Sequence, residues 1–171
     1  MTHNIGQSLH MGLSKHLRSK MLSRTTKLKL YNTLIVLVLI YDAETWNFTD
    51  SDDRMLDMFE RIVLRTIYGL VCVDGEWRTR YNHELYSLYK DDQVTKKIRV
   101  QRLSWLGHLA RMNDENVAKR VFERNPEGRR RIGRPKFRWK DSVLEDYQKL
   151  GVGLTWRTAP LDRAVWRGLI H

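Results

Sequence analysis

The sequence is poor in cysteine and in long hydrophobic runs. Its single cysteine, Cys72, excludes an internal disulfide and a cysteine-rich zinc knuckle, and a lone thiol suits a reducing compartment. The longest apolar run, residues 34–41, has eight residues, whereas a membrane-spanning helix needs roughly 20. The first thirty residues carry scattered charges instead of the charged start and apolar block of a secretory signal. We therefore expect a nuclear or cytoplasmic protein that is not secreted and has no membrane partner.

Acidic residues are nearly missing from two segments, and this concentrates the net charge of +11. Residues 1–30 contain six Lys or Arg and no acid, and residues 124–140 contain eight against Glu127 alone. Pro126 and Pro135 interrupt any helix in the second segment, which predicts an exposed basic loop. Focused positive patches raise the local concentration of anions, so nucleic acid is the first candidate partner. The alternative is that both segments are solvated charge runs without a partner.

Hydrophobic periodicity predicts helices along the whole chain and hence an all-α fold. The spacing favours helices at residues 25–45, 50–69, 84–89, 94–112, 117–122, 142–150 and 161–169. The second is the clearest, because acids occupy its first turns and Gly69 stops it. The run at residues 34–41 could by itself also be a strand. Residues 70–81 are expected to be a connector around Asp74-Gly75, and no paired strands are expected.

The expected core combines apolar positions of the three longest predicted helices. It comprises Leu34, Leu37, Val38, Phe59, Ile62, Val63, Ile67, Trp105, Leu106 and Leu109. Cations occupy the polar positions of the helix over residues 94–112, at Lys96, Lys97, Arg99, Arg102 and Arg111. Residues 124–138, by contrast, are expected to be exposed.

Candidate catalytic groups have structural explanations. The two Asp-Asp pairs, Asp52-Asp53 and Asp91-Asp92, precede or begin helices, where negative charge is favoured by the helix dipole or is simply solvated. Cys72, His83 and His108 could in principle bind zinc, but no spacing brings two of them onto one helical turn. There is also no glycine-rich phosphate loop and no Gly-x-Ser-x-Gly nucleophile elbow.

Five sequence blocks carry a more specific signal than any single residue. They are LYNTLIVLVLIYDAETW (residues 30–46), FERIVLRTIYG (59–69), RYNHELYSLYKD (80–91), QRLSWLGHLARM (101–112) and RNPEGRRRIGRPKFRWKDSVLEDYQKLGV (124–152). In this order they resemble the region that follows the polymerase palm in endonuclease-reverse transcriptases of non-LTR retrotransposons. The resemblance covers nearly the whole chain, from about residue 13 to residue 169.

The resemblance implies a helical, thumb-like bundle over residues 1–70, a connector and a long amphipathic helix over 71–123, and a basic loop with a small helical C-terminal part over 124–171. In that family the carboxylates that hold two divalent ions lie in the palm, upstream of every block matched here. The chain would then be a fragment of an RNA-directed DNA polymerase, not itself an enzyme, with no catalytic residue, metal or cofactor. Its partners would be RNA and DNA, as template-primer or element transcript, and its start at Met1 suits a truncated reading frame.

Two basic segments supply the candidate nucleic-acid contacts. In the first, Arg18, Arg24 and Lys27 would follow the template-primer duplex, as the resemblance implies, or would only solubilise a helix. In the basic loop, phosphate contacts are expected from Arg129, Arg130, Arg131, Arg134, Lys136 and Arg138. The aromatic residues Phe137 and Trp139 would either pack on the body or stack on an unpaired base. A second interpretation is that Gly133-Arg134-Pro135-Lys136 is similar to an AT-hook core, although Ile132 stands where an arginine is usual.

Two positions depart from the family pattern. Val36-Leu37 replaces Arg-Pro, and Asp42 replaces glycine. Both changes favour a straighter first helix, or they record damage in a decaying copy. Three functions therefore stay open: a reverse-transcriptase fragment that binds nucleic acid, a stand-alone chromatin or DNA-binding protein built around the basic loop, and a retroelement relic that acts, if at all, through protein contacts.

Overall fold

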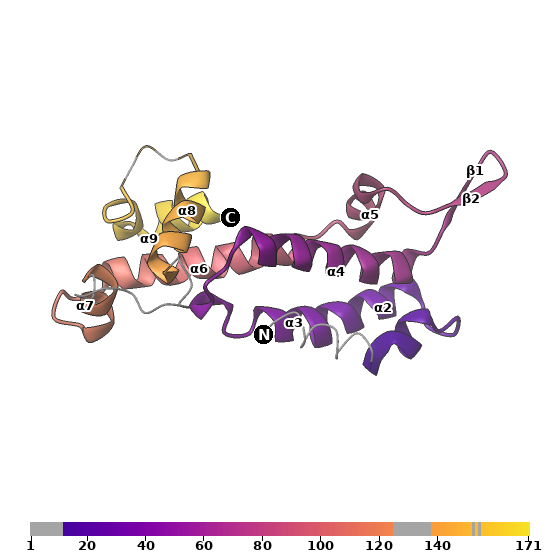
Figure 1. The fold of residues 1–171 in the computed structure, drawn as a ribbon, viewed down its shortest axis with the longest axis horizontal. Helices are drawn as coiled ribbons and strands as arrows, with labels where there is room; N and C mark the ends of the chain where they lie inside the picture. Colours follow the sequence, from indigo (N-terminus) through magenta and orange to yellow (C-terminus); the bar gives the residue numbers. More distant parts are fainter. Residues whose placement is uncertain (1–11, 125–137, 152, 154) are drawn as a thin grey trace, which may run out of the picture. The chain divides into compact units, whose positions relative to one another are not determined.

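A computed structural model describes residues 12–124, 138–151, 153 and 155–171 (Figure 1). Helices dominate, which confirms the predicted all-α class apart from one short hairpin. The chain divides into two compact units: unit 1 holds the residues up to 41 and residues 50–97, and unit 2 holds residues 42–49 and those from 98 onward. The boundary between the units falls inside the long helix that begins at Val94, whereas the boundaries expected from the sequence follow residues 70 and 123.

Unit 1 begins with helical residues 12–18, followed by a helical stretch made of α2 (Arg24–Leu30), the π-helix η1 (Tyr31–Val36) and α3 (Leu37–Ile40). Ser23 caps α2 by accepting a hydrogen bond from the Thr26 amide, 3.1 Å away. The stretch ends at Tyr41 and Asp42, and Asp42 has a left-handed backbone with φ 60°. The expected straightening at this position is therefore wrong, because Asp42 adopts the conformation that a glycine would reach with less strain.

The clearest predicted helix is present as α4 (Asp50–Tyr68). Asp50, Asp52 and Asp53 lie in its first turn, where the partial positive charge of the helix N-terminus favours them. Gly69 follows the helix with φ 72° and ends it, as expected. Within unit 1, α4 runs alongside α2 and contacts it (Figure 1).

The prediction that the chain has no paired strands is wrong. Strands β1 (Val71–Val73) and β2 (Glu76–Arg78) pair antiparallel, with Cys72 opposite Trp77. The turn residues Asp74 and Gly75 both have positive φ, 51° and 87°, as a tight two-residue hairpin turn requires. Strands of three residues are too short to show an alternating pattern, so only the Asp-Gly turn was visible in the sequence. Helix α5 (Asn82–Tyr89) follows the hairpin.

Unit 2 is built on the C-terminal part of α6 (Val94–Arg111), with α7 (Val117–Glu123), α8 (Trp139–Lys149), the short 3-10 helix η3 (Ala159–Leu161) and α9 (Arg163–Ile170). Its core includes Leu103, Leu106 and Leu109 of α6, packed with residues of α7, α8 and α9. Gly107 has a packing role, because a Cβ there would lie 2.8 Å from Cδ1 of Trp166. Glycine thus lets the Trp166 ring of α9 lie directly on the α6 backbone.

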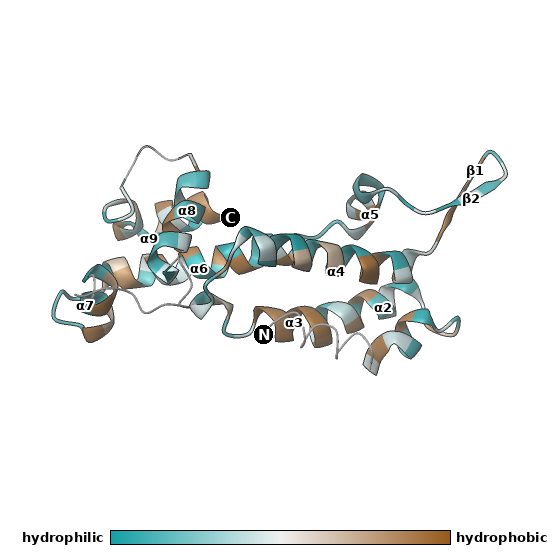
Figure 2. Cartoon of the chain, viewed as in Figure 1, coloured by the Kyte–Doolittle hydropathy of each residue, from teal (hydrophilic) through white to brown (hydrophobic). Residues whose placement is uncertain are grey.

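The expected core is half right. Val63, Ile67, Leu106 and Leu109 are buried, and Phe59 is half-buried. Five residues are wrongly predicted, because they are exposed: Leu34, Leu37, Val38, Ile62 and Trp105. The helical stretch through α3 is apolar on most sides (Figure 2), so hydrophobic periodicity could not identify its buried face. That face consists of Tyr31, Ile35, Val36 and Leu39. None of the helices in the described ranges is long and apolar enough to cross a membrane.

Candidate nucleic-acid interface

The N-terminal basic segment places two of its three candidate residues at the surface. Arg18, on the first described helix, and Arg24, at the start of α2, are both exposed. Lys27 differs, because it is only 8% exposed. No acid occurs within residues 1–30, so the exposed cations of this segment have no acid from their own segment beside them. Of the three candidate residues, Arg18 and Arg24 are therefore the two whose side chains are exposed.

Most of the basic loop lies outside the described residues. This applies to Arg129, Arg130, Arg131, Arg134 and Lys136, and equally to Phe137 and the AT-hook-like tetrapeptide. Arg138 is described: it is half-buried at the N-cap of α8, where its backbone amide donates to Asp141, 3.1 Å away. Trp139 packs on the body of unit 2, since its indole N–H donates to the Glu44 carbonyl at 2.6 Å and its ring meets Phe122 edge-on. Trp139 was expected either to pack on the body or to stack on an unpaired base, and in the structure it packs on the body.

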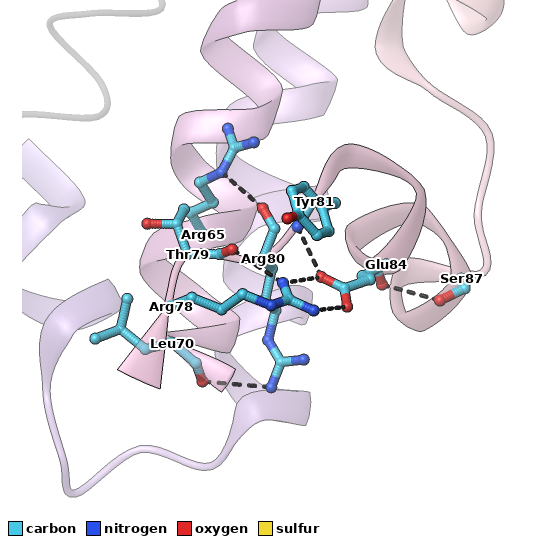
Figure 3. Close-up of polar contacts among 8 residues, drawn as sticks. All are labelled: Arg65, Leu70, Arg78, Thr79, Arg80, Tyr81, Glu84 and Ser87. Carbon is cyan, nitrogen blue, oxygen red and sulfur yellow. Dashed lines mark hydrogen bonds and ion pairs between the residues drawn. The ribbon is translucent and has the colours of Figure 1, made fainter. Parts of the chain in front are cut away.

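An arginine cluster beside the hairpin was not predicted (Figure 3). Arg78 of β2 forms a two-pronged ion pair with Glu84 of α5, at 2.7 and 2.9 Å, and its guanidinium stacks 4.3 Å from the Tyr81 ring centroid. Glu84 also accepts from the Tyr81 amide at 2.7 Å and so caps α5. The bonds from Arg78 and the amide lower the pKa of Glu84 to about 2. Glu84 is thus ionised at any physiological pH.

Two further arginines in this cluster bind backbone carbonyls. Arg65 donates to the Arg80 carbonyl at 3.4 Å, and Arg80 donates to the Leu70 carbonyl at 3.4 Å (Figure 3). Arg65 also donates to the Asn82 side chain at 2.7 Å. The cluster therefore fastens the hairpin and α5 to the end of α4. Arg78 is the member of this cluster that pairs with the Glu84 carboxylate, whereas Arg65 and Arg80 bind uncharged groups.

A carboxylate is buried in the middle of unit 1. Glu60 of α4 has no exposed surface and accepts hydrogen bonds from the Tyr31 hydroxyl at 3.1 Å, the Tyr86 hydroxyl at 3.4 Å and the Val94 amide at 3.3 Å. These donors come from η1, α5 and the first residue of α6, so one side chain joins four elements. Burial raises the pKa of Glu60 to about 7, although the bonds from Tyr31 and Val94 act in the opposite direction.

Two charged neighbours complete the surroundings of Glu60. Asp57, one turn earlier on α4, raises the pKa of Glu60, and Lys97 of α6 lowers it. Asp57 is itself engaged, since it accepts from Thr95 at 3.1 Å and lies 3.8 Å from Arg61. The effect of Lys97 is smaller than that of burial, so the pKa of Glu60 stays raised.

We expect unit 1 to lose stability as the pH rises through 7. The pKa of Glu60 is about 7 in the folded chain and about 4.5 in the unfolded chain, so folding binds a proton between these values. The contribution of Glu60 to the free energy of unfolding is complete below about pH 4.5 and declines by up to about 3 kcal/mol towards pH 8. Urea unfolding at several pH values should show this slope in the wild type and not in Glu60→Gln. Glu115→Gln, an exposed carboxylate after α6, is the matched control, and an unchanged slope in Glu60→Gln would refute the assignment.

An ion pair is buried in unit 2. Arg102 of α6 is fully buried, although its charge predicted a polar, outward position. Its guanidinium donates to Asp146 at 2.5 Å and to the Ser142 hydroxyl at 2.8 Å, and Ser142 in turn donates to the Phe48 carbonyl. Burial lowers the pKa of Arg102 while Asp146 raises it, and arginine remains charged in either case. This network ties α6 to α8 and to the segment before α4.

A cavity of about 500 Å³ opens between α6, α7 and the start of α8 in unit 2. Its walls are mainly apolar and aromatic, from Trp105, Leu109, Ala118, Val121, Phe122 and Trp139. Its remaining lining residues are cations: Arg124, Arg138 and Lys140. Aromatic surface beside positive charge is the chemistry with which proteins hold single-stranded nucleic acid.

Acidic and metal-binding residues do not converge in the described ranges. No group of three or more His, Cys, Asp or Glu there is arranged to hold a metal ion. Asp91 and Asp92 pair with Lys97 and Lys96 at 2.8 and 2.7 Å. Cys72 is exposed on β1, and His108 is exposed with its ring 5.1 Å from that of Trp105.

A comparison with known proteins finds a distant relative. The chain is similar to an uncharacterized transposon-derived protein of Caenorhabditis elegans, with 22% identity over 163 residues. The alignment covers 92% of this chain and 58% of the relative, so the chain spans less than two thirds of that protein's length. No protein-family profile matches the chain, and no solved structure matches it significantly.

Proposed function

We propose that this chain is the thumb and C-terminal extension of a non-LTR retroelement reverse transcriptase, and that it binds RNA and DNA without carrying the catalytic centre. The observation that carries the proposal is the order of the five blocks, whose last member contains the basic loop. Similarity to a transposon-derived protein over 92% of the chain supports a retroelement origin. The mostly helical fold is compatible with a thumb.

The blocks also have a physical connection in unit 2. Arg102 belongs to the block at residues 101–112, and its partners Ser142 and Asp146 belong to the block at 124–152. Residues from two separate blocks thus meet in one buried network. Side chains that must match each other in the core give a reason for these residue types to occur together, independently of any function.

Binding is proposed to act through phosphates. Arg18 and Arg24 are exposed in unit 1, and the basic loop adds Arg129, Arg130, Arg131, Arg134, Lys136 and Arg138. Contacts of this kind are insensitive to base sequence and weaken steeply with salt. Lys27 is left out of the proposed contacts because its side chain is buried. The relic and the AT-hook alternatives are separated from this proposal by the binding experiments described below.

We expect the purified chain to incorporate no nucleotide on a primed RNA template, with either magnesium or manganese. Phosphoryl transfer by polymerases needs carboxylates that converge on two metal ions, and the proposal places those carboxylates in a palm outside this chain. The measurement is primer extension with radiolabelled nucleotide, with an intact retroelement reverse transcriptase on the same template as the positive control. Template-dependent extension by this chain would overturn the assignment.

A further inference from the structure

We propose that the cavity between α6, α7 and the start of α8 takes an unpaired base of single-stranded RNA or DNA. This inference rests on the proposed function, because it names a specific site for part of the nucleic acid. It concerns unit 2 alone, since every residue that lines the cavity belongs to that unit.

The walls of the cavity suit a flat aromatic ligand. Trp105 is 36% exposed and Val121 71% exposed, so two large apolar side chains stand partly in water beside a buried wall that contains Phe122. His108 lies against the Trp105 ring, with 5.1 Å between the ring centroids. A planar base that stacked in the cavity would remove this apolar surface from water, and every base offers a π-face for such stacking.

The cations decide which class of ligand fits. Lys140 lies 5.4 Å from the Phe122 ring centroid, and its ammonium group donates to the Glu123 carbonyl at 3.2 Å, so it is held over the aromatic wall. Arg124 and Arg138 line the same cavity. An apolar ligand such as a protein helix would gain little from these charges. A base that is joined to phosphates uses both the aromatic wall and the cations.

The test compares three fluorescently labelled nucleic acids with the full chain: a single strand of mixed sequence, the same strand with every second base removed, and a blunt duplex. The partly abasic strand keeps its phosphates, so weaker binding to it reports the bases alone. Trp105→Ala should weaken binding of the intact strand by about ten- to a hundredfold, the range expected for one stacked base. It should leave duplex binding and the salt dependence unchanged, because no phosphate contact is lost.

Two further variants define the outcome. Trp105→Phe keeps an aromatic face and should restore most of the affinity, and Trp77→Ala removes a tryptophan that is 70% exposed on β2 and should have no effect. Equal binding of the intact and partly abasic strands by the wild type would overturn the inference and leave the proposed function standing, and that arm does not depend on any variant folding. An equal loss of duplex binding in Trp105→Ala, or an equal loss in Trp77→Ala, would also overturn it. Absence of all nucleic-acid binding by the wild type would refute the proposed function itself, and the inference with it.

Discussion

Replacing Arg102 with alanine is expected to lower the free energy of unfolding by about 3–5 kcal/mol. The substitution leaves Asp146, which is only 6% exposed, without the guanidinium that lies 2.5 Å from it. It also removes the donor to Ser142 and leaves a cavity where a fully buried side chain lay. Arg99 lies 3.6 Å from Asp146 but is itself partly exposed, so it replaces little of this interaction. Urea unfolding followed by circular dichroism measures the loss.

The double variant Arg102→Met with Asp146→Leu separates charge from packing. Because both buried charges are removed together, its loss of stability should be clearly smaller than the sum of the two single losses. Arg120→Ala, on the exposed side of α7, is the matched control and should change stability by no more than about 0.5 kcal/mol. A loss below about 1 kcal/mol for Arg102→Ala would contradict the buried network.

Local signals predicted the long helices α4 and α6 of this fold, but not the β1–β2 hairpin. Helix α4 was found because its acids, its spacing and its stop signal at Gly69 are all encoded within about 20 neighbouring residues. The burial of Arg102 depends on Asp146, which is 44 positions away, and no local pattern reports such a partner. A signal was nevertheless present. Arg102 lies on the same stripe as Ile98 and Leu106, one turn before and one turn after it, and both are fully buried.

The side of a uniformly apolar helix could not be predicted for a different reason. Around residues 31–40 nearly every position is hydrophobic, so the period carries no information about which face is buried. The structure buries Tyr31 and Ile35 and exposes Leu34 and Leu37. The buried face includes a polar contact, in which the Tyr31 hydroxyl donates to the buried Glu60 carboxylate. Because Glu60 lies 29 positions away, the local pattern carries no signal of this contact.

One part of the candidate site could be predicted from the sequence, and another part could not. Composition indicated the basic segments, because a cluster of charged residues is visible in the sequence without knowledge of the fold. The cavity of unit 2 was not predicted, although Trp105 was noticed, because its walls come from three helices and meet only in the folded chain. Trp139, for which the sequence left packing and stacking open, packs on the body and is hydrogen-bonded to the Glu44 carbonyl. Trp105, which the sequence assigned to the core, is 36% exposed and lines the cavity.

Changing Arg129, Arg130, Arg131 and Arg134 together to alanine is expected to weaken RNA and DNA binding by about a hundredfold or more at moderate salt. Each phosphate contact that is lost should reduce the slope of log affinity against log salt by about 0.7 for single strands and about 0.9 for duplexes, because one fewer counterion is released. The effect should be nearly independent of sequence, since phosphates carry no base identity. Fluorescence anisotropy at several salt concentrations measures both quantities.

The control variant removes the same charge from other places in unit 2, at Arg120, Arg157, Arg163 and Arg167, all of them exposed. If the loop contacts phosphate, this variant should keep most of the salt slope, whereas a general effect of net charge would weaken both variants equally. The AT-hook interpretation makes a different forecast: Arg134→Ala alone would abolish a preference for A·T-rich over G·C-rich duplex and leave binding of single-stranded RNA intact. Unchanged affinity in the fourfold loop variant would refute both mechanisms and favour a relic that has lost its nucleic-acid partner.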